Sequence, residues 1–222
     1  MGEKATFHIR HQVLPIYLAE TLQLLSDPTA SSRPEDLLKR ASEAGLSLGK
    51  LESAKGAISD TLNIGRHLGL VIGDCLTAYG QAMLELWQRK DTIFHEAIHY
   101  RFYSLRLLPE ARFSWTYATV CELLWRSGSS MVERKKLASE ITVQAKQAFG
   151  LGVSLSSDTI TGVLNWLEPL KPPVIADEGG KTVFTRRTFC PPELFLLAVD
   201  YVYTLEKTNY GSNVLLDQRR RE

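Results

Sequence analysis

The chain has 222 residues, of which 44% are hydrophobic and 23% are charged. This is the composition of a globular protein that can bury a core, and the length allows one large domain or two small ones. The net charge of only +1 excludes a protein that coats nucleic acid through bulk charge, because such proteins are far more basic. Any contact with nucleic acid therefore has to come from local patches of charge.

Three cysteines, Cys75, Cys121 and Cys190, lie far apart and form no Cys-x-x-Cys pair. This pattern argues against a disulfide framework and a cysteine-rich zinc site, and it indicates a reducing compartment. Residues 1–8 contain no apolar signal core. The longest apolar stretch, around residues 194–199, is far shorter than the ~20 residues that cross a bilayer. We therefore expect a cytoplasmic protein with no membrane partner.

The N-terminal part of the chain alternates helical and turn signals. Apolar residues at helical spacing predict helices over residues 12–25, 34–45 and 50–67. Two short apolar runs joined by Gly73-Asp74 predict a small hairpin. Thr77 is a suitable cap for a further helix that runs to Trp87.

This order of helix, helix, tight turn, helix and hairpin resembles the winged helix-turn-helix unit. The resemblance covers roughly residues 34–87 and rests on two stretches, AISDTLNIGRHLGLV at 57–71 and LTAYG at 76–80. In that family the third helix runs into a similar Leu-Gly-Leu-Val segment, and a similar Leu-Thr pair starts the next helix. The resemblance implies a third helix that enters the major groove of DNA and a hairpin, or wing, that touches phosphates.

The C-terminal part of the chain follows a similar plan. The residue pattern predicts helices over 115–125, 130–150 and 157–167, the second opened by a capping box of Ser130 and Glu133. Residues 174–185 read as a wing-like hairpin, and Pro191 starts a final helix that ends near Leu205. The segments ISDTL (58–62) and SDTIT (157–161) precede the two hairpins, which makes an internal duplication a reasonable hypothesis.

We therefore expect a mainly α protein with small β-hairpins, in which two winged-helix-like units are joined by a helical connector. The expected boundaries are 1–90 for the N-terminal helix and the first unit, 91–110 for the connecting helix, and 111–222 for the second unit with a C-terminal helix and a basic tail.

The candidate DNA-binding residues lie on the third helix of the first unit and on the wing of the second. The helix offers side chains that can contact phosphates or base edges: Lys50, Lys55, Ser59, Asn63 and Arg66. Glu52 and Asp60 dilute its positive charge, so an ordinary solvated face is the alternative. The third helix of the second unit contains no Lys or Arg, whereas its wing carries Lys181, Arg186 and Arg187.

Residues 95–99 spell His-Glu-Ala-Ile-His, which resembles the zincin metalloprotease motif at the level of these five residues. On a helix His95 and His99 lie one turn apart and can share a zinc ion, while Glu96 can act as general base. A catalytic zinc needs a third protein ligand, for which Glu122 is the best spaced candidate. The residues around Glu122 do not match the usual pattern, so we expect no catalytic site and no cofactor, with a zinc hydrolase as an alternative.

The resulting expectation is a non-catalytic adaptor that binds double-stranded DNA and other protein subunits, with a homodimer as an open possibility. Paired units of this kind resemble accessory subunits of prokaryotic DNA-handling or phage-defence (antiviral) systems, and also transcription regulators. A protein-interaction scaffold without DNA contact is the other alternative.

Overall fold

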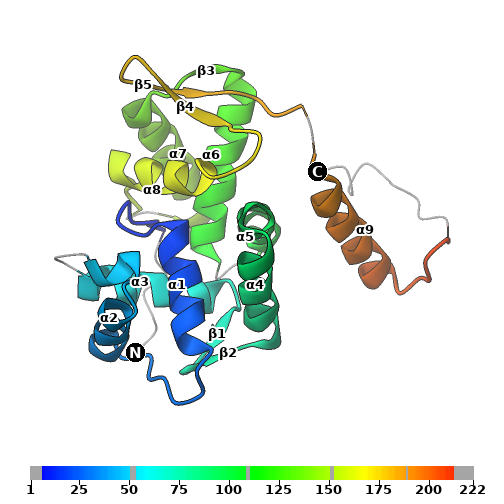
Figure 1. Cartoon of the computed structure of the whole chain (residues 1–222). Coiled ribbons are helices and arrows are strands. Elements are labelled where there is room, and N and C mark those ends of the chain that lie inside the picture. The colour runs from blue at the N-terminus through cyan, green and yellow to red at the C-terminus, as the bar shows by residue number, and fades with distance from the viewer. Residues whose placement is uncertain (1–6, 51–53, 109–110, 151–152, 189, 213–222) are drawn as a thin grey trace. The chain divides into compact units, whose positions relative to one another are not determined.

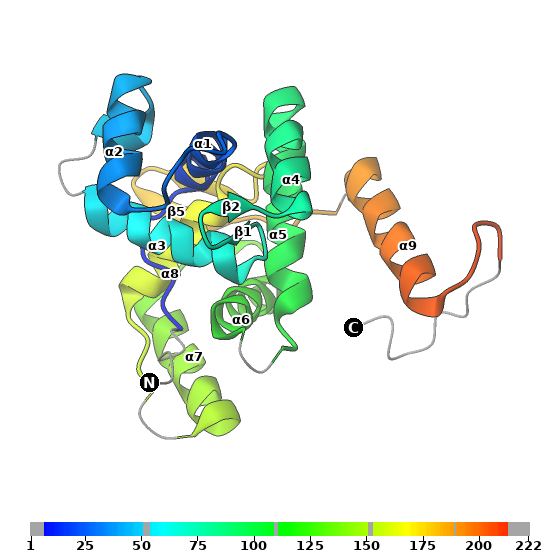
Figure 2. The ribbon, with the colours of Figure 1, turned by 90° about the horizontal axis from the view of Figure 1, so that it is seen from below.

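The computed structural model describes residues 7–50, 54–108, 111–150, 153–188 and 190–212. Over these residues the chain is mainly helical with two small antiparallel sheets, as expected (Figures 1 and 2). None of the described helices combines the length and the apolar character needed to cross a lipid bilayer. The helices are α1 (Pro15–Leu25), α2 (Pro34–Glu43), the short 3-10 helix η1 (Ser47–Lys50), α3 (Ala54–His67), α4 (Ala78–Arg89), α5 (Asp91–Leu105), α6 (Arg112–Ser127), α7 (Arg134–Phe149), α8 (Ser157–Leu167) and α9 (Pro192–Glu206). The strands are β1 (Val71–Ile72), β2 (Cys75–Leu76), β3 (Ser130–Met131), β4 (Ile175–Glu178) and β5 (Lys181–Phe184).

The chain divides into two compact units between Arg186 and Arg187. The first unit, Met1–Arg186, holds every described element from α1 to β5, and the second, Arg187–Glu222, holds α9. The predicted segments 1–90 and 91–110 and most of 111–222 therefore pack into one body. Within the first unit, we call the segment from α1 to β2 the first half and the segment from α6 to β5 the second half.

Helix α1 forms the centre of the first half. It begins at Pro15, a position where the missing proline N–H costs no intrahelical bond. Every residue of α1 except Ile16 and Gln23 is buried, and α2 and α3 pack on it in Figure 1. A helix enclosed in this way can hold the elements around it in fixed positions.

The turn between α2 and α3 is anchored by a buried carboxylate. Glu20 on α1 is only 6% exposed. It accepts hydrogen bonds from the backbone N–H groups of Ser47, at 2.9 Å, and Leu48, at 2.8 Å. Gly49 lies so close to α2 that a Cβ there would be 2.5 Å from the backbone nitrogen of Ser42. These contacts fix η1 against α1 and α2.

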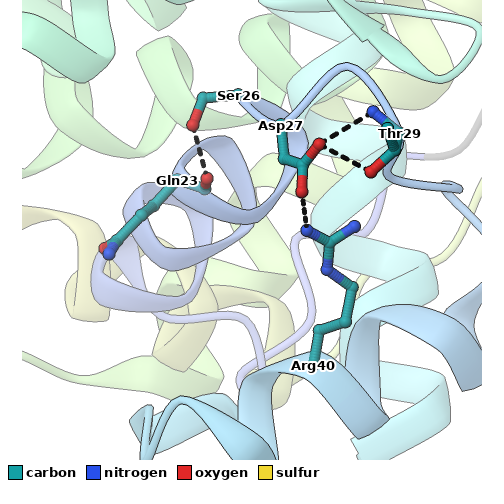
Figure 3. A network of polar contacts seen from close by, with 5 residues as sticks. All are labelled: Gln23, Ser26, Asp27, Thr29 and Arg40. Atoms are coloured by element: carbon teal, nitrogen blue, oxygen red, sulfur yellow. Dashed lines mark hydrogen bonds and ion pairs between the residues drawn. The ribbon is translucent and has the colours of Figure 1, made fainter.

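A second polar network holds the connection between α1 and α2 (Figure 3). The carboxylate of Asp27 accepts bonds from the backbone N–H and the hydroxyl of Thr29 and from the Arg40 guanidinium on α2. The hydrogen bonds from Thr29, with a smaller contribution from Arg40, lower the pKa of Asp27 to about 2. The Ser26 hydroxyl donates to the carbonyl of Gln23 and closes the last turn of α1.

The hairpin and the two following helices form as the sequence predicts. In the hairpin Val71 pairs with Leu76. The Thr77 hydroxyl accepts a bond from the Gly80 N–H at 2.9 Å, which confirms its role as the cap of α4. Helix α5 lies within the predicted connecting segment 91–110 and buries one apolar face: Phe94, Ala97, Ile98, Phe102 and Leu105.

The second half has the element order α6, β3, α7, α8, β4, β5, and its sheet has the strand order β3-β5-β4. The predicted capping box is wrong. Ser130 lies in β3, where it pairs with Phe184 of β5, and α7 begins only at Arg134 without a side-chain cap from Glu133. Pairing with β5 holds the backbone of Ser130 extended. This pairing prevails over a helix N-cap at Ser130, which would stabilise the helix by only about 1 kcal/mol.

The N-terminal segment, residues 7–13, packs against the second half before the chain enters α1 (Figures 1 and 2). We call it the strap. Phe7 inserts among aromatic rings of the second half, with ring centroids 6.1 Å from Trp115 and 5.1 Å from Phe149. Ile9 and Val13 are fully buried. The segment that the sequence assigns to the first unit therefore contributes to the core of the second half.

Candidate nucleic-acid interface

Helix α3 presents one exposed polar stripe: Lys55, Ser59, Asn63 and Arg66. Steps of four, four and three residues keep these side chains on one face of a helix. The opposite side of α3 is closed, with Ile58, Leu62 and Ile64 at most 2% exposed. The stripe therefore has the arrangement that a groove-reading helix needs, polar side chains outward on a backbone held from behind.

The fifth predicted residue of this surface, Lys50, is exposed but lies elsewhere. It ends η1 rather than opening α3, so the predicted helix start is wrong there. Residues 51–53, which include Glu52, lie outside the described residues. The tight turn that the sequence predicts before the third helix is present, but it extends through Lys50 as η1, where Glu20 and Gly49 make their contacts.

The two cations of the stripe already have partners within the protein. The Lys55 ammonium lies 3.2 Å from the Glu35 carboxylate. The Arg66 guanidinium donates to the Ser32 hydroxyl at 3.2 Å and to the Gly73 carbonyl at 3.3 Å. These contacts are solvent-exposed and individually weak. A phosphate could replace these partners, but in the free protein this face of α3 carries little uncompensated positive charge.

Helix α8, the third helix of the second half, is almost entirely covered. Asp158 is its only exposed residue within Ser157–Leu167. The strap lies on it: the Asn165 amide donates to the His11 carbonyl at 2.8 Å, and His8 Nδ1 lies 2.9 Å from the Thr159 hydroxyl. Burial lowers the pKa of His8. In this conformation α8 cannot enter a groove of DNA.

The predicted wing residues do not act as one group. Lys181 is exposed, and in the hairpin it stands opposite Glu178. Arg186 is bound to the end of α6: its Nε donates to the Trp125 carbonyl at 2.6 Å, and its guanidinium lies over the Trp125 ring. Arg187 is partly buried and begins the other compact unit. Arg186 therefore has a structural role, because it satisfies carbonyls that the last turn of a helix leaves open.

Three consecutive basic residues were missed as candidates. Arg134, Lys135 and Lys136 form the first turn of α7, and all are exposed. The Arg134 guanidinium donates to the Thr182 hydroxyl of β5 at 2.9 Å, so this turn adjoins the hairpin. A run of three cations at a helix start is visible in the sequence, but it was interpreted only as part of a helix.

The two histidines of the HEAIH segment face different neighbours. His95 packs between aromatic rings, 5.7 Å from Trp87 and 5.4 Å from Phe94, and burial lowers its pKa. His99 Nδ1 lies 2.8 Å from the Tyr117 hydroxyl on α6. The helix places the two rings one turn apart, but each belongs to a different packing contact.

The carboxylates of the zinc alternative are also engaged elsewhere. Glu96 is 2% exposed and accepts a bond from the Lys171 backbone N–H at 3.2 Å. Glu122 accepts from the Tyr103 hydroxyl at 2.9 Å; burial first, and then this bond, raise the pKa of Tyr103 to about 12. Within the part of the chain that the structure describes, no three His, Cys, Asp or Glu side chains lie close enough to hold a metal ion. His95, His99 and Glu122 are thus not brought together.

The candidate interface consists of the stripe on α3 and the basic first turn of α7. The first is polar and charge-compensated, and the second is cationic. No protein-family model matches the chain, and no curated protein or solved structure gives a significant match. Its function must therefore be inferred from these side chains.

Proposed function

We propose that this protein is a non-catalytic DNA-binding adaptor with two winged-helix units, in which α3 is the groove-reading helix. The order α1, α2, α3, β1, β2 of the first half resembles a winged helix with a minimal wing. The order α6, β3, α7, α8, β4, β5 of the second half, with its three-stranded sheet, resembles the same unit in fuller form. In such units the third helix reads the major groove.

The observation that carries this proposal is the stripe on α3 together with its rigid support. Ser59 and Asn63 stand at its centre, exposed and without a side-chain partner among the described residues. Serine and asparagine can donate to or accept from base edges, and Asn is suited to adenine. The buried side of α3, which includes Ile58, Leu62 and Ile64, holds the helix in one position, and base reading requires such support.

The first test is fluorescence anisotropy of a labelled random duplex, titrated with the full chain at low and at physiological salt. We expect binding that weakens steeply with salt, because phosphate contacts release counterions. The variant Ser59→Glu/Asn63→Glu places two carboxylates on the stripe facing the DNA. It should lower the affinity at least tenfold, because two carboxylates would face the phosphates of the groove.

The matched control is Gln81→Glu/Gln88→Glu, which adds the same charge on exposed positions of α4. It should change the affinity much less than the stripe variant does. If both variants lost affinity equally, the loss would come from net charge alone, and α3 would not be part of the interface. Absence of salt-dependent binding by the unmodified protein would end the proposal of DNA binding itself.

In a cell we propose that such an adaptor serves as an accessory subunit of a prokaryotic DNA-handling or antiviral defence complex, or as a transcription regulator. Both roles need protein partners, and the apolar character of α9 supports this part of the proposal. Phe195 and Leu196 are 59% and 60% exposed. Within its own compact unit, no described side chain of α9 is buried.

The second candidate function, a protein-interaction scaffold without DNA contact, rests on the same helix. We propose a second copy of the chain as the partner that covers α9. Light scattering should then give a mass above the 24.9 kDa of one chain, and Phe195→Asp/Leu196→Asp should return it to one chain. A single-chain mass for the unmodified protein at high concentration would argue against self-association.

A further inference from the structure

The first turn of α7 is the densest run of basic residues in the described part of the chain. Arg134, Lys135 and Lys136 follow one another and are exposed. Neither lysine has a side-chain hydrogen bond or an ion pair among the described residues, and Arg134 bonds only the uncharged hydroxyl of Thr182. These three residues, named the α7 basic turn, carry positive charge with little compensation from within the protein.

This distinguishes the α7 basic turn from three cations of the first half that are paired with carboxylates. There Lys55 is paired with Glu35, Arg40 with Asp27, and Lys39 with Glu43. Carboxylates do occur near the α7 basic turn, since Glu133 precedes it and Asp177 and Glu178 lie on β4. The Asp177 carboxylate, however, accepts a bond from the Gly180 N–H of its own turn.

The α7 basic turn is also held in position. The Val132 N–H donates to the Thr182 carbonyl at 2.8 Å, directly beside the bond from Arg134 to the Thr182 hydroxyl. Two bonds to one residue of β5 attach the start of α7 to the hairpin. Successive residues of a helix point about 100° apart, so Lys135 and Lys136 can reach different phosphates.

We propose that the α7 basic turn is a second, sequence-independent contact with the phosphate backbone of double-stranded DNA. This inference rests on the proposed function and adds that the two halves contact different parts of the DNA. Because α8 is covered by the strap, the second half has no exposed third helix to read bases. The second half contacts the phosphate backbone of the DNA through α7 instead, while α3 reads the bases in the major groove.

The test is the salt dependence of duplex binding by Lys135→Gln/Lys136→Gln in the full chain. Each phosphate contact contributes about 0.9 to the slope of log affinity against log salt concentration. The variant should therefore lower the magnitude of the slope by about 2, and weaken binding to all duplex sequences to the same extent. The control Lys39→Gln/Lys146→Gln removes the same charge at other exposed sites and should leave the slope unchanged.

The outcomes separate the two proposals. If the unmodified protein binds and the α7 variant keeps the full slope, the second contact is refuted and DNA binding stands. If the control loses as much slope as the α7 variant, the effect belongs to net charge and the second contact is again refuted. If the unmodified protein binds no duplex, both proposals fail. Equal thermal unfolding of the three proteins establishes that the fold is intact.

Discussion

The third helices of the two halves, α3 and α8, follow similar elements in the chain and have opposite surroundings. Each is preceded by helices and followed by a hairpin. Helix α3 exposes a polar stripe along its outer side, whereas α8 exposes only Asp158 within its described length. The apolar residues of α8 account for part of this difference, and the strap that lies on it accounts for the rest.

The comparison teaches that element order alone does not define a binding surface. Seven residues before α1 cover a part of α8 that the other elements of the second half leave uncovered. Ile9 and Val13 of the strap are fully buried, and its backbone bonds to α8. A half with this element order can therefore have its third helix covered, and under the proposed function its contact with DNA has to use another element.

The largest expected effect concerns the turns that lead into the two helices. In the first half Glu20 accepts two backbone N–H groups, whereas in the second the Thr142 hydroxyl accepts one, from Leu155 at 3.0 Å. Glu20→Ala should lower the free energy of unfolding by about 3 kcal/mol, and Thr142→Val by about 1 kcal/mol, because bonds to a carboxylate are stronger than bonds to a hydroxyl.

Urea unfolding at constant m-value measures both changes. Glu20→Gln keeps one acceptor oxygen and should fall between the unmodified protein and Glu20→Ala. If Glu20→Ala were no less stable than Thr142→Val, the buried carboxylate would not be the anchor of the turn before α3.

A second pair of substitutions compares glycines inside the two helices. In α8 a Cβ on Gly162 would lie 2.0 Å from the Ile9 carbonyl oxygen, a backbone atom that cannot rotate away. Gly162→Ala should therefore push the strap aside and cost about 2 kcal/mol. In α3 a Cβ on Gly56 would meet nothing within 4 Å, so Gly56→Ala should stabilise the protein by about 0.5–1 kcal/mol.

Proteolysis sharpens this second test. Displacement of the strap exposes its backbone, so limited proteolysis should cut Gly162→Ala near residues 8–12 and leave Gly56→Ala intact. If Gly162→Ala left the protein as stable as before or more stable, the strap would yield easily, and α8 would be covered less firmly than the contacts of Asn165 and Gly162 indicate.

Much of the fold could be predicted because its signals are local. The cap at Thr77 depends on residues within one turn, and the structure confirms it. The strap could not be predicted in this way, because its partners Gly162 and Asn165 lie about 150 residues away. The pattern of Phe7, Ile9 and Val13 shows apolar residues, but not the surface that they cover.

The candidate site shows the same limit. The spacing of Lys55, Ser59 and Asn63 was sufficient to place them on one exposed face. The partners of Arg66 and Arg186 come from distant loops and helix ends, so the sequence around each arginine could not reveal them. The SDT triplets behind the duplication hypothesis also differ in position, since Ser59 is inside α3 while Ser157 is the first residue of α8.

The smallest expected effect is a pH dependence confined to the first half. Hydrogen bonds from Thr29 and Arg40 hold the pKa of Asp27 at about 2, below its ordinary value of 3.8 (Figure 3). The folded state therefore favours the ionised form. Its contribution to stability is complete above pH ~4 and is lost as the pH falls toward 2. Because the network is exposed to solvent, the contribution is small.

Asp27→Asn should consequently be slightly less stable than the unmodified protein at pH 7, and the difference should vanish near pH 2. Urea midpoints at a series of pH values measure this, and an NMR titration of the Asp27 carboxyl gives its pKa directly. Thr29→Ala removes one of the three bonds and should raise that pKa part of the way toward 3.8. A carboxyl that titrates at 3.8 in the unmodified protein would show that the α1–α2 connection is not held by this network. The position of α2 would then rest on its apolar contacts, since Leu37 and Ala41 are fully buried, while Glu20 would still hold η1.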